Sequence, residues 1–423
     1  MPQRLVVLSL PQLRRRDVTP GAIASLESLS RLGSLVDLIP AFPGLAASSF
    51  ATLMTGTGPD EHGIVGDTYY DRAEGRIAGR PLPDSAVLAP KLWEWLKRER
   101  PEAKVMLWFA PSTHGAEVDL AAWADAGATL STRPEGLAAE LVARFGPLPA
   151  SASPTDEPPR LEAMAWLLAT AASVIVAEAP DLAVVRVPYL GQVARRYGPD
   201  GREAGRSVRT FEAGLREFLA LLPRDTAVVV ATESVSTPVF EPTFPNRILR
   251  GLGLLSLKSG PSGGLDIDLN SSAAFALADH QICHLYLNDP RQIGPVAAAF
   301  AGPHGSGVAQ VASMGQRAAL GMDHPRAGDV ILVAEPDRWF APDWWSSRAE
   351  APGHPPVSAS GMALATAGGL LLNPEHVQGS LGAPPPGADY LGVLVSSVTL
   401  PPAAISGPIR ASEVFSVCQR LLA

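Results

Sequence analysis

The chain has 423 residues, of which 46% are apolar and 18% are charged, with a formal net charge of −8 and a pI near 5.5. This length suffices for one large α/β domain or two ordinary ones, and the negative charge argues against nucleic acid as a partner. The two cysteines, Cys283 and Cys418, belong to no CxxC pattern, which argues against a disulfide scaffold or a structural zinc site.

The first apolar run, Leu5–Leu10, is interrupted by Ser9 and ended by Pro11. It is too short for a membrane span and lacks the small-residue cleavage site of a signal peptide. We therefore interpret it as a buried first strand. We expect no later run to reach membrane-spanning length, and therefore expect a cytoplasmic protein with no membrane partner.

Strands and helices then alternate as far as residue 235, which is typical of a mostly parallel sheet covered by helices on both faces. Strands are expected at Leu5–Leu10, Ser34–Ile39, Lys104–Phe109, Leu182–Val187 and Thr226–Ala231, and helices at Thr19–Leu32, Phe50–Met54, Leu92–Lys97, Leu161–Ala177 and Ser207–Leu222. Ligands of such sheets bind at the carboxyl ends of the strands. The loops that begin at Ser9, Ile39, Pro188 and Thr232 are therefore the candidate site.

The pattern changes after residue 235. Residues 236–345 combine a helix near Asn246–Gly253, a Gly/Ser turn at 259–264 and strands such as His284–Leu287 and Val330–Ala334. We expect an inserted α+β subdomain at 236–345, with a core domain made of 1–235 and 346–423. The segment 341–385 is rich in Pro, Gly, Ala and Ser, so a long surface loop is expected there.

Two motifs in this second part are set aside. Gly260–Gly264 spells G-x-S-x-G, but it lies between two expected strands, whereas a nucleophile elbow needs a strand before it and a helix after it. His280 and His284 are four residues apart and could face the same side of a strand as metal ligands. Without an obvious third ligand, the favoured interpretation is that local hydrogen bonds satisfy them.

The strongest pattern is TGTGPDEHGIVGDTYYDR at 55–72. It resembles the stretch T-G-x-x-P-x-x-H-G-I-V-G-N of the type I phosphodiesterase and nucleotide pyrophosphatase family, in the alkaline phosphatase superfamily. Further resemblances lie at Arg195–Pro199, which contains Y-G-P, and at 244–250, 278–281, 323–326 and 339–340. The resemblance covers most of the chain in order. It implies an alkaline-phosphatase-like α/β three-layer sandwich with an inserted α+β subdomain.

The resemblance also implies chemistry: two zinc-type ions held by Asp and His, and a Thr or Ser nucleophile between them. In this chain the nucleophile position holds Ala46. The ligand positions hold Pro11, Gly191, Arg195, Glu233, Ser234 and, in the best register, Ser360, with His354 as the nearby alternative. Pro, Gly and Ala side chains have no metal donor, and an arginine places a permanent positive charge where a dication should bind.

We therefore expect a phosphodiesterase-like protein that is catalytically inactive, needs no cofactor and keeps a cleft for a small molecule or a protein partner. Arg195, Glu233 and Ser234 are the candidate ligand-binding residues, and an Arg195–Glu233 ion pair is expected in place of the metals. If that pair is absent, recognition of an anion by Arg195 becomes the better hypothesis. One alternative is an active hydrolase with Ser48 or Ser49 as nucleophile, either without metal or with the two zinc-type ions. Another is a scaffold protein that uses the inserted subdomain.

Overall fold

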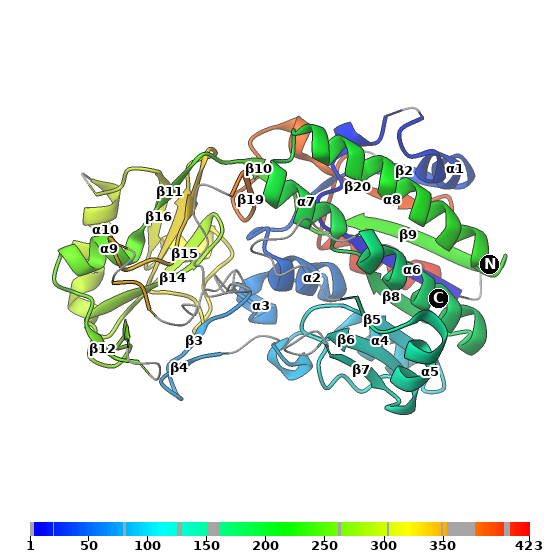
Figure 1. The fold of residues 1–423 in the computed structure, drawn as a ribbon, viewed down its shortest axis with the longest axis horizontal. Helices are drawn as coiled ribbons and strands as arrows, with labels where there is room; N and C mark the ends of the chain where they lie inside the picture. Colours follow the sequence, from blue (N-terminus) through cyan, green and yellow to red (C-terminus); the bar gives the residue numbers. More distant parts are fainter. Residues whose placement is uncertain are drawn as a thin grey trace.

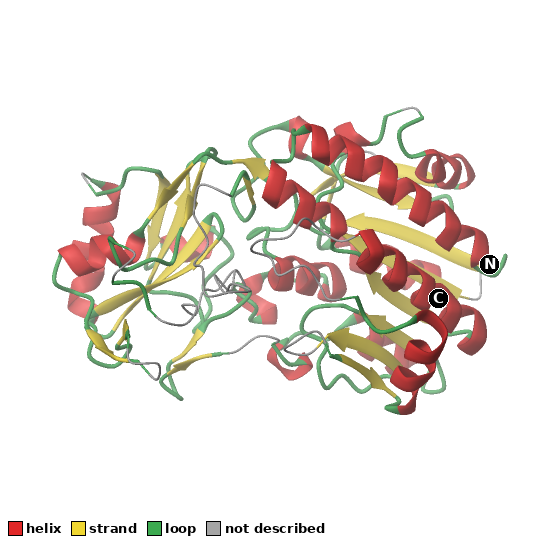
Figure 2. Cartoon of the chain, in the orientation of Figure 1, coloured by secondary structure: helices red, strands yellow, loops and turns green. Residues whose placement is uncertain are grey.

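The structure is a computed structural model that describes residues 4–19, 21–78, 82–124, 129–149, 161–260, 264–302, 304–347, 350–352, 377–401 and 407–423. It has two lobes that lie side by side along the long axis of the molecule (Figure 1). The larger lobe contains a nine-stranded sheet and the smaller lobe a four-stranded sheet. Figure 2 shows helices packed on the larger sheet and a smaller helical layer on the second lobe.

The nine-stranded sheet has the order β21-β2-β20-β9-β1-β8-β5-β6-β7. The pairs β9–β1, β1–β8, β8–β5 and β5–β6 are parallel, whereas β20 and β7 run antiparallel to their neighbours. The strands are β1 (Arg4–Leu10), β2 (Ser34–Ile39), β5 (Val105–Trp108), β6 (Leu120–Ala124), β7 (Leu130–Arg133), β8 (Leu182–Arg186), β9 (Thr226–Thr232), β20 (Gly392–Ser396) and β21 (Ile409–Arg410). The expected mostly parallel sheet is confirmed, and its central strands are buried and apolar, as strands covered on both faces must be.

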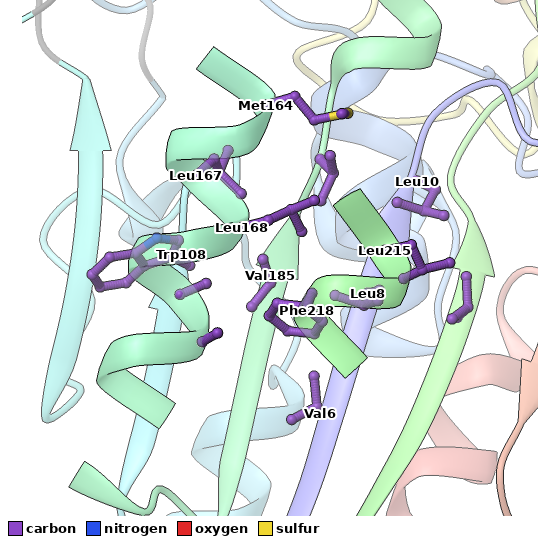
Figure 3. Packing of buried hydrophobic residues seen from close by; sticks show 14 of the residues in the cluster. Val6, Leu8, Leu10, Trp108, Met164, Leu167, Leu168, Val185, Leu215 and Phe218 are labelled. Carbon is purple, nitrogen blue, oxygen red and sulfur yellow. The ribbon is translucent and has the colours of Figure 1, made fainter. Parts of the chain in front are cut away.

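Two hydrophobic cores lie on opposite faces of this sheet, because successive strand side chains point to opposite sides. Val6 and Leu8 of β1 face the first core and Leu5 and Val7 face the second. The first core, part of which Figure 3 shows, is covered by α1 (Ala24–Leu32), α5 (Gly136–Phe145), α6 (Leu161–Glu178), α7 (Tyr189–Tyr197) and α8 (Arg202–Leu221). The second is covered by α2 (Ala46–Thr55), α4 (Leu92–Glu99) and α12 (Glu413–Leu422). The result is an α/β sandwich of three layers.

Helix α6 corrects one expectation. By length and composition alone it could cross a membrane, whereas no run of membrane-spanning length is expected from the sequence analysis above. Nine of its 18 residues are buried, and all of these except Thr170 belong to the first core of the sandwich. A core helix of a soluble domain passes the same test, so this finding is weak support for a membrane span.

The second lobe is built on an antiparallel sheet of order β14-β15-β17-β16. Its elements are α9 (Pro245–Gly251), β12 (Leu257–Ser259), β13 (Leu265–Ile267), β14 (Ala274–Asp279), β15 (Ile282–Leu287), α10 (Ile293–Ala301), β16 (Val308–Ser313), α11 (Gln316–Ala319) and β17 (Val330–Ala334). Strands β12 and β13, which flank residues 260–264, pair antiparallel, so this segment joins the two strands of a hairpin and does not lead from a strand into a helix as a nucleophile elbow would. The limits 236 and 345 stay a prediction, because Tyr70 also packs into this lobe, 5.0 Å from the Phe275 ring.

Short elements join the lobes: α3 (Pro59–His62), the hairpin β3 (Tyr70–Asp71) with β4 (Arg76–Ile77), the pair β10 (Thr237–Pro238) with β19 (Gly379–Ser380), and the pair β11 (Glu241–Thr243) with β18 (Arg338–Phe340). Within the described residues, single-turn 3-10 helices lie at η1 (Arg15–Asp17), η2 (Asp84–Ala86), η3 (Pro290–Gln292) and η5 (Ala388–Tyr390), of which the last precedes β20.

Two helix boundaries differ from the sequence expectation for identifiable reasons. Helix α1 begins at Ala24 rather than at residue 19, because Gly21 has a left-handed φ of 80° that is incompatible with a helix. Helix α2 begins at Ala46 rather than at Phe50, and it ends where Gly56 adopts the left-handed conformation of a helix C-cap. The earlier start places the whole first turn of α2 at the candidate site.

Candidate functional site

The candidate site lies at the carboxyl ends of β1, β8 and β9. The register aligns Ser9 of β1 with Arg186 of β8, and Leu10 with Thr232 of β9. The loops that follow are joined by backbone hydrogen bonds, from the Glu233 amide to the Leu10 carbonyl at 2.9 Å and from the Gln12 amide to the Ser234 carbonyl at 2.7 Å. The loops selected from the sequence therefore do converge at one edge of the sheet.

Two of the family's ligand positions meet at this edge. A Cβ atom built on Gly191, in α7, would lie 3.1 Å from the Cβ and 3.3 Å from the Cγ of Pro11. The backbone at Gly191 thus packs closely against the Pro11 side chain, and a larger side chain at residue 191 would have to displace it. Neither residue has a side-chain donor, so this pair cannot replace the carboxylates that a metal would need.

Glu233 is the one carboxylate left among the aligned ligand positions, and it is fully buried. Its partner is Arg186, whose Nε and Nη2 atoms donate to the two carboxylate oxygens at 2.7 and 2.8 Å. The Ser9 hydroxyl donates a third hydrogen bond at 3.0 Å. Such a two-pronged guanidinium–carboxylate pair is among the strongest polar contacts in proteins.

This geometry corrects the expected ion pair. Among the described residues, the cation in contact with Glu233 is Arg186 and not Arg195, which lies two turns into α7. Arg195 is half-buried, and its backbone carbonyl accepts a hydrogen bond from the Gln378 amide at 3.2 Å. Sequence reasoning missed Arg186, although a charged residue that ends an apolar buried strand is a usable signal. A role for Arg195 in anion recognition stays a prediction.

The Arg186 guanidinium is a permanent charge in this site. Burial alone would lower its pKa, but the charge and hydrogen bonds of Glu233, together with the charge of Asp67, raise the pKa above its ordinary value. Its side chain is only 15% exposed. The positive charge at this edge of the sheet therefore belongs to a side chain of the protein, which cannot dissociate as a bound metal ion can.

The expected nucleophile position is Ala46, the first residue of α2, which is partly exposed. The fallback residues Ser48 and Ser49 lie in the same turn, but both are fully buried. The Ser49 hydroxyl donates to the Pro43 carbonyl at 3.4 Å, whereas the Ser48 hydroxyl has no hydrogen-bond partner among the described residues. Neither serine is thus seen in the nucleophile–base pair that an activated serine requires.

The stretch at 55–72 forms the connection between the lobes. His62 is buried, accepts a hydrogen bond from the Ile64 amide at 3.1 Å and contacts the Thr52 hydroxyl at 3.1 Å. Gly63 adopts a left-handed φ of 74°, which a residue without a side chain allows. Arg326, from the second lobe, donates to the Gly63 carbonyl at 3.0 Å. The motif therefore acts as a rigid connector that several buried hydrogen bonds hold.

The two histidines considered as metal ligands have different surroundings. The His284 Nδ1 atom accepts from the Gly328 amide at 3.1 Å, and its Nε2 atom faces the Val65 carbonyl at 3.2 Å. His280 occupies the turn between β14 and β15, where its Nδ1 atom lies 3.4 Å from the Ser380 hydroxyl. For His284 the interpretation as a residue satisfied by local hydrogen bonds is confirmed.

The residues at this edge do not fit the two metal ions that the family resemblance implies. Pro11, Gly191 and Ala46 have no donor atoms, and a guanidinium already binds the remaining carboxylate. Within the part of the chain that the structure describes, no three His, Cys, Asp or Glu side chains are grouped so as to hold a metal ion. Ser360 and His354, the alternatives for the last ligand position, lie outside the described residues.

The fold and this edge of the sheet define an alkaline-phosphatase-like protein. The sequence model of the family "Type I phosphodiesterase / nucleotide pyrophosphatase" matches residues 5–358, so the chain belongs to this family. A search of curated protein sequences finds no match.

Solved structures show the same fold. The chain is similar to phosphonoacetate hydrolase from Sinorhizobium meliloti 1021 in complex with phosphonoformate, with a TM-score of 0.69, 15% identity, and 100% of this chain and 96% of that chain covered. It is also similar to murine ectonucleotide pyrophosphatase / phosphodiesterase 5, with a TM-score of 0.64, 14% identity, and 99% and 95% covered. An inactive form of the murine protein, with a threonine replaced by alanine and AMP bound, gives a TM-score of 0.63 at 14% identity, with 99% and 95% covered.

Proposed function

We propose that this chain is a non-hydrolysing member of its family, which binds a small molecule or a protein partner and does not cleave phosphoric esters. The observation that carries this proposal is the buried Arg186–Glu233 pair, in which a fixed guanidinium neutralises the carboxylate that would otherwise be free for a metal ion. A cytoplasmic location and the absence of a cofactor belong to the same proposal.

The chemistry of the family makes hydrolysis by this edge of the sheet difficult. Two metal ions would stabilise the charge that develops on the phosphoryl oxygens and lower the pKa of the nucleophile. Ala46 offers no hydroxyl, Pro11 and Gly191 offer no side-chain metal donor, and Arg186 already neutralises Glu233. The loss of a single electrostatic contact to a transition state typically lowers the rate by roughly 10²- to 10³-fold, so these losses together remove most of the acceleration. The inactive murine neighbour also carries alanine in place of a threonine.

The alternative hydrolase with a displaced nucleophile has less support. Ser48 and Ser49 would have to reach substrate from fully buried positions in the first turn of α2. The scaffold alternative, in which the second lobe contacts a partner, is compatible with the same geometry, because it requires no binding or catalytic site at the edge of the sheet.

Elemental analysis and a turnover assay on the same purified sample test the proposal. We expect no stoichiometric zinc or manganese, and no cleavage of bis(4-nitrophenyl) phosphate above the uncatalysed rate, with or without added Zn²⁺ or Mn²⁺. The variants Ser48→Ala and Ser49→Ala are measured beside Ser28→Ala, an exposed serine on α1.

Turnover that copurifies with the protein and disappears in Ser48→Ala or Ser49→Ala, but persists in Ser28→Ala, would contradict the proposal and support the displaced nucleophile. Tightly bound metal together with turnover would contradict it as well and indicate a metal-dependent hydrolase.

A further inference from the structure

The first turn of α2 holds a carboxylate of the protein itself. Asp67, which follows the connector stretch, accepts a hydrogen bond from the Ala47 amide at 2.7 Å through its Oδ1 atom. Asp67 is only 4% exposed. Helix α2 has ten residues, and its N-cap residue, Leu45, makes no side-chain cap. A negative group at this place is favourable, because the free amides of a helix N-terminus attract anions.

The same carboxylate lies within the field of the Arg186 guanidinium. The charge of Asp67 is one of the contributions that raise the pKa of Arg186. Arg186 is itself paired with Glu233, so the N-terminus of α2 and the Arg186 guanidinium, two features that could hold an anionic ligand, both have protein carboxylates as partners.

A buried hydroxyl lies at the same helix end. The Ser48 hydroxyl, in the first turn of α2, is fully buried and has no hydrogen-bond partner within the part of the chain that the structure describes. An unsatisfied buried hydroxyl is costly, so it is retained where a neighbouring polar group or ligand can come within reach. The helix end therefore resembles an anion site whose anion is part of the chain.

We propose that Asp67 is a resident anion at the N-terminus of α2, and that its carboxylate excludes phosphate esters and other anionic ligands from this edge of the sheet. In this proposal, Asp67 is the residue that determines which class of ligand is excluded from the site. This inference rests on the proposed function, since a hydrolase would need its anionic substrate at the same place.

The backbone amide of Asp67 holds the residue in position. It donates to the Asp279 carboxylate, in the second lobe, at 2.8 Å. This contact involves the main chain and is kept when the side chain is replaced. A change of the Asp67 side chain consequently alters the charge at the helix end without releasing the loop from the second lobe.

Two variants test the inference by titration with inorganic phosphate in a calorimeter. Asp67→Ala removes the charge and frees the Ala47 amide, whereas Asp67→Asn removes the charge but keeps an oxygen that can accept from this amide. Asp60→Asn, an exposed residue in α3, is the matched control with the same change of charge. We expect both Asp67 variants to bind phosphate at least about tenfold more tightly than the wild type and Asp60→Asn, because a like charge at the helix end is removed.

Asp67→Asn decides the outcome if Asp67→Ala does not fold, as judged by circular dichroism. Folded variants that bind phosphate no more tightly than the wild type would overturn the inference, as would a wild-type protein that binds phosphate as tightly as Asp67→Asn. These results are distinct from a failure of the proposed function, which shows as metal content and ester turnover of the wild-type protein.

Discussion

Replacement of Arg186 by methionine should destabilise the protein strongly. The substitution keeps most of the side-chain volume but leaves the Glu233 carboxylate, which is 0% exposed, with the Ser9 hydroxyl as its remaining side-chain partner. Two charge-assisted hydrogen bonds of 2.7 and 2.8 Å are lost. Removal of one partner from a buried ion pair typically costs about 3–5 kcal/mol, because the remaining charge stays desolvated.

A double variant measures the interaction between Arg186 and Glu233 apart from the contacts that each makes with other residues. Arg186→Met with Glu233→Leu removes both charges, and a buried pair replaced by apolar residues of similar size is often close to neutral. We therefore expect the double variant to cost less than the sum of the two single variants by about 2–3 kcal/mol. Arg195→Ala with Glu233→Leu should show no such coupling.

Urea denaturation followed by circular dichroism measures these free energies, and thermal unfolding provides a second readout. Additive single variants, or coupling of Glu233 to Arg195 instead of Arg186, would refute the account of the ion pair. A stable Arg186→Met protein would do the same, since it would mean that Glu233 does not depend on Arg186 in the native state.

Two further predictions concern stability. Burial lowers the pKa of His62 to about 3, with a further contribution from His324, and burial lowers the pKa of His284 to about 4. Each histidine is neutral when folded, so its stabilising contribution is present above pH 6.5 and is lost as the pH falls. Between pH 7 and pH 5 we expect a loss of about 2 kcal/mol for each, partly offset by about 1 kcal/mol from Asp343, whose pKa burial raises to about 6. Urea titrations at several pH values measure this, and a flat profile between pH 7 and pH 5 would contradict it. Arg326→Ala should cost about 1–3 kcal/mol, because two loop carbonyls lose their donor, whereas the exposed Arg291→Ala should be neutral in the same thermal unfolding assay.

The sequence was sufficient to predict the sheet and the edge at which the site lies. Apolar runs such as Leu182–Val187 have the length and composition of buried parallel strands, and the structure places β8 within that range. Loops that follow parallel strands must meet at one edge, which is why Pro11, Gly191 and Glu233 were found together.

The identity of the ion pair could not be predicted in the same way. Glu233 follows β9, whereas Arg186 ends β8 and Arg195 lies in the helix after β8, and β8 and β9 flank β1. From the sequence, either arginine could therefore face the carboxylate. The register Ser9↔Arg186 decides the matter, because it fixes Arg186 beside β1 and directs its side chain to the loop after β9. Register depends on pairing between strands that are distant in the sequence, which periodicity alone does not reveal.

The role of Asp67 was missed for a related reason. The sequence shows only an acidic residue after a Gly-rich stretch, a place where a solvated side chain is common. Its contact with the Ala47 amide depends on the start of α2 at residue 46, four residues before the start expected from the sequence. A shift of one helical turn thus changed an unremarkable loop carboxylate into a buried helix-end contact.

The metal content of the purified wild-type protein tests the central claim most directly. Elemental analysis after extensive dialysis against metal-free buffer should find no zinc or manganese in stoichiometric amount, because Arg186 already neutralises Glu233 and the side chains of Pro11, Gly191 and Ala46 have no metal donor. Retention of one or two transition-metal ions per chain, lost in a Glu233→Gln variant that is still folded, would contradict the account.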